Sequence, residues 1–102
     1  RARYEPIARM AARAGGIDQD LYVRQIAQES GFDPEAYNNG SGATGIAQIV
    51  RRFHPGVDPT DPVASLNYAA DWMGRLYLQY GSYRDARRND GSDRNAADAR
   101  SP

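Results

Sequence analysis

The chain has 102 residues, with 13 basic and 13 acidic side chains, so its formal net charge is zero. This balance argues against strong capture of nucleic acid, because that binding comes from clustered basic residues that neutralise phosphates. The length suits one domain with a single modest core. Cysteine is absent and there is one histidine, which excludes disulfides and thiolate metal sites and leaves too few ligands for a typical zinc site. We therefore expect no metal and no cofactor.

No apolar run approaches the roughly 20 residues that a membrane-spanning helix needs, so we expect no membrane span. The first four residues lack the apolar stretch of a signal peptide and do not begin with methionine. We expect a processed product or a piece of a longer protein, monomeric as a domain.

Apolar residues with three- and four-residue spacing predict a first helix over residues 4–14, which two glycines end. An aspartate, Asp18 or Asp20, is the expected N-cap of a second helix that runs to Ser30. Gly31 follows it at the position where a left-handed C-cap glycine belongs.

Glycine and asparagine are frequent in residues 32–45, which predicts a long ordered loop rather than a pair of strands. Residues 46–53 are expected to form a short helix. Asp61 followed by Pro62 is an N-cap with proline at the first helical position, and it opens a long helix that ends at Gly81.

A final short helix is expected from Tyr83, and the chain from Arg87 onward has no aliphatic residue larger than alanine. Such a composition does not offset the entropy of ordering, so we expect a mobile tail. The expected organisation is a domain over residues 1–86 and a polar tail over 87–102. The fold class is mainly α, with an ordered glycine-rich loop and no convincing strand.

Glu29 stands out because it lies in the last turn of the second predicted helix. The unpaired carbonyl groups there disfavour a carboxylate by about 0.3–1 kcal/mol, which is expected to raise its pKa. A raised pKa is what a general acid at neutral pH requires. Position alone does not separate this role from that of a solvated helix residue.

Three segments in order and spacing resemble the soluble lytic transglycosylase domain, which is related in fold to goose-type lysozyme. Ile26–Ala36 reads IAQESGFDPEA and is similar to the first signature of that family. Gly42–Ile49 reads GATGIAQI and is similar to the second, and Asp61–Leu66 is a looser third match. The resemblance covers roughly residues 20–81, and the first two segments together are specific where either alone would be weak.

The resemblance implies a small lysozyme-like helical domain that cleaves peptidoglycan glycan strands at the bacterial cell wall, in the periplasm, outside the cell or on a virion. Glu29 matches the family's acid/base, which protonates the oxygen between N-acetylmuramic acid and N-acetylglucosamine. It would then accept the proton of the C6 hydroxyl, giving a 1,6-anhydro end, while the N-acetyl group replaces a second carboxylate. Asp33 and Glu35 are interpreted as turn and loop residues rather than as its catalytic partner.

The resemblance also suggests substrate contacts. Gln48 matches a family glutamine beside the acid, and its amide can donate and accept hydrogen bonds. Asn38 or Asn39 falls where the family often has a substrate-contacting serine, and Ile46 with Ala47 would form part of an apolar cleft wall.

Two further candidates and one departure complete the predicted site. Ser30 is kept as a candidate contact, although we expect it to cap or pack. The family's C-terminal tyrosine motif is missing, and Tyr83 is the candidate substitute. His54 has no family counterpart that we can name and is expected at the surface or in a turn.

The leading interpretation is a lytic transglycosylase, in a phage tail protein or in a bacterial cell-wall remodelling system. A hydrolysing lysozyme that uses the same glutamate is the close alternative. A module that grips glycan strands without cutting them, motivated by the missing tyrosine, and a purely structural helical scaffold remain open.

Overall fold

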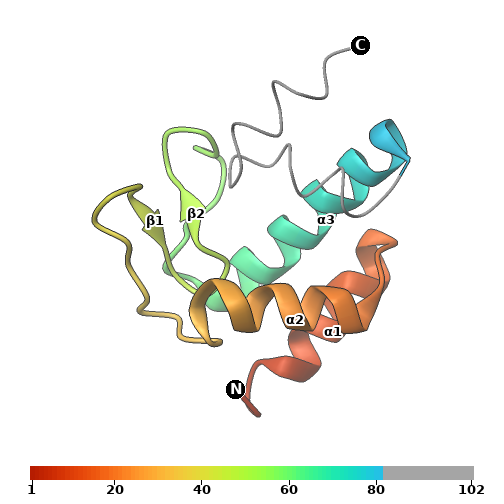
Figure 1. Ribbon diagram of the computed structural model, residues 1–102, viewed down its shortest axis with the longest axis horizontal. Helices are drawn as coiled ribbons and strands as arrows, with labels where there is room; N and C mark the ends of the chain where they lie inside the picture. Colours follow the sequence, from red (N-terminus) through yellow and green to blue (C-terminus); the bar gives the residue numbers. More distant parts are fainter. Residues whose placement is uncertain (82–102) are drawn as a thin grey trace.

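The computed structural model of the chain describes residues 1–81, with the side chain of Tyr80 excepted. Within that range the fold has three helices and one small two-stranded sheet (Figure 1). The elements, in chain order, are α1 (Glu5–Gly15), α2 (Gln19–Ser30), β1 (Ala43–Thr44), β2 (Ile49–Val50) and α3 (Pro62–Tyr80). The prediction of a mainly α fold is therefore confirmed. The predicted helix from Tyr83 and the predicted tail over 87–102 lie outside the described residues.

The predicted helix ends are confirmed because local chemistry sets them. Asp18 caps α2 by accepting a hydrogen bond from the backbone N–H of Leu21 at 3.0 Å. Asp61 caps α3 in the same way, with Pro62 as the first helical residue. All three helices end at a glycine in the left-handed region, namely Gly16, Gly31 and Gly81.

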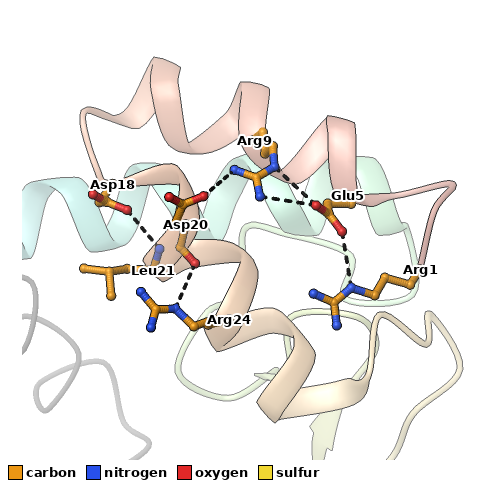
Figure 2. A network of polar contacts seen from close by, with 7 residues as sticks. All are labelled: Arg1, Glu5, Arg9, Asp18, Asp20, Leu21 and Arg24. Atoms are coloured by element: carbon orange, nitrogen blue, oxygen red, sulfur yellow. Dashed lines mark hydrogen bonds and ion pairs between the residues drawn. The ribbon is translucent and has the colours of Figure 1, made fainter.

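Asp20, the other candidate cap, instead joins α2 to α1 through Arg9 (Figure 2). One guanidinium nitrogen of Arg9 donates to Asp20 at 2.8 Å, and another lies 3.3 Å from Glu5. The hydrogen bond from Arg9 lowers the pKa of Asp20, and the hydrogen bond from Arg1 is the main cause that lowers the pKa of Glu5. This exposed network holds the outer surfaces of α1 and α2 together.

The core forms where α1 packs against both α2 and α3. Small residues allow α1 and α3 to approach closely, since a Cβ atom added to Gly74 would overlap the carbonyl group of Gly15. Tyr22 of α2 is fully buried, and its hydroxyl donates to the Leu66 carbonyl of α3 at 2.6 Å. The largest apolar side chains that are fully buried with it are Ile26, Ile46, Leu66 and Met73. No helix within residues 1–81 is long and apolar enough to cross a bilayer.

The region between α2 and α3 corrects two predictions. Ala43 pairs with Val50 and Thr44 with Ile49, so the segment expected to lack strands contains one side of a hairpin. The short helix expected over 46–53 is also wrong, because the chain turns back between β1 and β2.

The turn has a clear conformational cause. Gly45 at φ 80° and Gln48 at φ 52° both adopt the left-handed region, which no α-helix accommodates. Gly45 is also required sterically, since a Cβ atom there would overlap the carbonyl oxygen of Pro59. The hairpin therefore packs tightly against the segment that leads into α3.

Candidate active site

A cavity of about 400 Å³ opens between α2, the hairpin and α3, a size typical of small-ligand sites. Figure 1 shows how the end of α2 and the hairpin lie beside the first half of α3. The lining is contributed mainly by Gln25, Gln28 and Glu29 from α2, by Ala43, Gln48 and Ile49 from the hairpin, and by Tyr68, Ala69, Trp72 and Met73 from α3.

Glu29 lies where the sequence analysis expects it, in the last turn of α2, and its side chain is half-buried at the cavity. The last turn of α2 contains no basic residue that would offset the negative end of the helix. Among residues 1–81, Glu29 is the only carboxylate that lines this cavity. Asp33 accepts a hydrogen bond from the backbone N–H of Glu35 at 2.8 Å in an exposed turn, and neither residue reaches the cavity.

Ser30 fixes the end of α2 against the hairpin. Its hydroxyl donates to the Ile46 carbonyl at 2.6 Å and accepts from the Phe32 N–H at 3.1 Å. It does not line the cavity, so the structure places it in a positioning role. Phe32 has a positive φ of 62°, and its ring is buried in the core. This sharp reversal after Gly31 brings the glycine-rich segment back over the end of α2.

Gln48 lines the same cavity as Glu29, as the resemblance implies. Its side-chain NH2 group donates to the carbonyl oxygens of Ala36 at 3.2 Å and Gly45 at 3.0 Å. The amide therefore holds the hairpin turn closed and has its carbonyl oxygen left to accept a hydrogen bond from a neighbour in the cavity. The resemblance predicts that Gln48 lies beside Glu29, but it does not predict the two hydrogen bonds that the NH2 group donates to the backbone.

Of the other predicted substrate contacts, some line the cavity and others do not. Asn38 and Ala47 line the cavity, and the Asn38 carboxamide oxygen accepts two backbone N–H groups that shape the turn before β1. Asn39 is exposed and does not line the cavity. The prediction for Ile46 is wrong, since this residue is fully buried in the core and only Ala47 faces the cleft. Tyr83 lies outside the described residues.

His54 is predicted at the surface or in a turn; its backbone N–H does close a turn onto the Arg51 carbonyl at 3.1 Å, but its side chain is not at the surface. It is 9% exposed, lines the cavity, and its Nδ1 lies 2.8 Å from the hydroxyl of Tyr68. Its ring meets the rings of Tyr68 and Trp72 edge to face. Tyr68 and Trp72 are absent from the predicted site residues, although their four-residue spacing places both on one face of α3 and is a usable signal. Within residues 1–81, no cluster of three or more histidine, aspartate or glutamate residues could hold a metal ion.

These features define the class of protein. A small helical domain that presents a helix-terminal glutamate and a hairpin glutamine to one cavity agrees with the lysozyme-like class that the sequence resembles. The chain belongs to the Transglycosylase SLT domain family, whose model matches residues 6–96. No curated protein and no solved structure matches the chain. At the level of the family, this membership means an enzyme of the lytic transglycosylase type that acts on cell-wall peptidoglycan.

Proposed function

We propose that the protein is a peptidoglycan lytic transglycosylase in which Glu29 is the single general acid/base. It would cleave the β-1,4 bond between N-acetylmuramic acid and N-acetylglucosamine and leave a 1,6-anhydro end on the muramic acid. The observation that carries the proposal is that Glu29 alone, among the carboxylates of residues 1–81, lines the cavity between α2, the hairpin and α3. A site with one carboxylate suits substrate-assisted cleavage rather than the two-carboxylate scheme.

The reaction needs no water and no second enzymic acid. Protonated Glu29 donates its proton to the glycosidic oxygen as the bond to C1 of the muramic acid breaks, while the carbonyl oxygen of the N-acetyl group bonds to C1. The Glu29 carboxylate then accepts the proton of the C6 hydroxyl, whose oxygen attacks C1 and releases the N-acetyl oxygen. Glu29 ends protonated again, so the proton balance closes.

Two features of the structure suit Glu29 to this cycle. The carboxyl group lies at the negative end of α2, which favours its protonated form. Gln48 has its carbonyl oxygen left to accept, either from a protonated carboxyl group or from the N–H of the substrate's acetamido group. The two residues are joined through Ser30 and Ile46, which fix the end of α2 to the hairpin turn.

The experiment is mass analysis of purified peptidoglycan digested by the protein and by its Glu29→Gln variant. We expect anhydro-muropeptides from the parent and a rate about 100- to 10,000-fold lower from the variant, the usual value of a general acid/base. Glu35→Gln is the matched control, because Glu35 is exposed and outside this cavity. It should leave the rate unchanged.

The same measurement separates the alternatives. Products with a free reducing end, heavier by one water, would replace the transglycosylase with a hydrolysing lysozyme. Equal rates for the parent and Glu29→Gln would refute Glu29 as the acid. Retention of glycan strands without any product would indicate a binding module.

A further inference from the structure

Three aromatic side chains with polar atoms form one wall of the cavity, on the side of α3: they are His54, Tyr68 and Trp72. His54 Nδ1 lies 2.8 Å from the Tyr68 hydroxyl, and the ring centroids of His54 and Trp72 are 4.8 Å apart at an interplanar angle of 84°. All three residues line the cavity that Glu29 enters from α2. The proposed mechanism uses none of them.

Packing alone does not account for this cluster. Apolar side chains of similar size would fill the wall without burying polar atoms, which cost free energy unless they are hydrogen-bonded. Trp72 Nε1 is buried and has no hydrogen-bond partner within the described part of the chain. The hydrogen-bonded His54 and Tyr68 side chains lie in the cavity lining, where a few polar groups among apolar ones are typical of a site that orients a polar ligand.

We propose that the Tyr68 hydroxyl contacts the glycan and that His54 is a positioning residue which sets whether this hydroxyl donates or accepts. The inference rests on the proposed function, because it takes the glycan strand as the occupant of the cavity. It assigns to the α3 side of the cleft a role in substrate orientation.

The chemistry follows from the bond at Nδ1. When His54 is neutral with its proton on Nε2, the Tyr68 hydroxyl donates to Nδ1 and offers the cavity only its lone pairs. When His54 is protonated, Nδ1–H donates to the Tyr68 oxygen, and the hydroxyl proton turns to the cavity. The protonated pair therefore presents a donor that suits the acetamido carbonyl of an N-acetylated sugar.

The remaining groups around the pair are few. Within residues 1–81, Glu29 from α2 is the only other ionisable residue of the cavity lining besides Tyr68, and the hairpin contributes neutral side chains. Arg51 and Arg52 precede His54 and are exposed, and Asp58 follows it in an exposed turn. Replacing Glu29 with glutamine leaves the pair of His54 and Tyr68 as the ionisable side chains of this lining within residues 1–81.

The test is calorimetric binding of the N-acetylglucosamine tetramer to the Glu29→Gln protein between about pH 5 and 8, the range in which histidine side chains in general change charge. We expect the affinity to be about three- to tenfold higher at the acidic end, the value of one hydrogen bond. Adding His54→Asn, which keeps a polar atom near the Nδ1 position but does not titrate, should make the affinity independent of pH. Adding Tyr68→Phe, which keeps the ring, should weaken binding and also remove the pH dependence.

Binding that does not vary with pH in Glu29→Gln, or pH dependence that survives His54→Asn or Tyr68→Phe, would overturn the inference. If His54→Asn does not fold, as judged by circular dichroism, the Tyr68→Phe arm decides. The outcome is separable from the proposed function, because the parent's digestion products test Glu29 alone. Cleavage with pH-independent binding refutes only the role of the pair, and pH-dependent binding without cleavage refutes only the catalytic role of Glu29.

Discussion

Ser30→Ala is the substitution that best tests how the cavity is assembled. The Ser30 hydroxyl donates to the Ile46 carbonyl at 2.6 Å and, at a longer 3.3 Å, to the Ile26 carbonyl of the preceding helical turn, and it accepts from the Phe32 N–H at 3.1 Å. All three partners belong to residues that are almost fully buried, at 0%, 1% and 2% exposure. Alanine removes these bonds and adds no clash.

The expected cost follows from these contacts. Each bond contributes about 0.5–1.5 kcal/mol net, and a buried group left without a partner costs about 1–3 kcal/mol. We therefore expect Ser30→Ala to lower the free energy of unfolding by about 2–3 kcal/mol, a large share of the 5–15 kcal/mol typical of a domain. The cleavage rate should fall about tenfold or more, because the bond to Ile46 aligns Glu29 with Gln48 and small displacements of catalytic groups are costly.

Urea unfolding followed by tyrosine and tryptophan fluorescence measures the free energy of unfolding, and turbidity loss of purified cell walls measures the cleavage rate. Ser65→Ala is the matched control, since Ser65 is fully buried and its hydroxyl makes one bond, to the Asp58 carbonyl, away from the cavity. It should cost about 1 kcal/mol and leave the rate unchanged. A loss below about 0.5 kcal/mol for Ser30→Ala, well under the cost of one stranded buried group, would refute the reasoning.

Two other predictions concern the hairpin and the surface network. Gly45→Ala should lower the melting temperature sharply in a thermal scan, because the added Cβ atom would overlap the Pro59 carbonyl oxygen and because φ is 80° at this position. A melting temperature within a degree or two of the parent's would contradict this. The pKa of Asp20 is lowered by its hydrogen bond from Arg9, so the pair stabilises the fold above the carboxyl group's unfolded pKa and loses this effect as pH falls through the lowered value. Melting curves between about pH 5 and 2 should show a smaller acid loss for Asp20→Asn, and added salt should remove the difference.

The sequence predicts the helices and their ends because each boundary depends on residues a few positions apart. Asp18, Gly31 and Asp61 act through hydrogen bonds and dihedral angles within one turn of the helix. Glu29 could be located for the same reason, since its distance from the end of α2 is a local property. The sequence does not decide between Asp18 and Asp20 as the cap, because the partner that engages Asp20 lies on another helix.

The hairpin and the burial of His54 against α3 could not be predicted because tertiary contacts create them. Gln48 adopts a left-handed conformation that its residue type does not favour, and it is held there by carbonyl groups from two other parts of the loop. His54 looks like a turn residue in the sequence and is buried only because Tyr68 and Trp72 of α3 lie against it. Ile46 reads equally well as cleft wall or core, and the turn of the hairpin decides for the core.

Backbone strain is concentrated around the candidate site. Among residues 1–81, the non-glycine residues with positive φ are Phe32, which follows the end of α2, and Gln48, which lines the cavity. Such conformations cost about 1–3 kcal/mol each and persist only when surrounding contacts enforce them. Burial of the ring enforces the first, and the two amide hydrogen bonds enforce the second. A helix that continued past the end of α2, or a relaxed turn at Gln48, would remove this strain but would also separate Glu29 from Gln48. The strained backbone therefore keeps the carboxyl group and the amide in the same cavity.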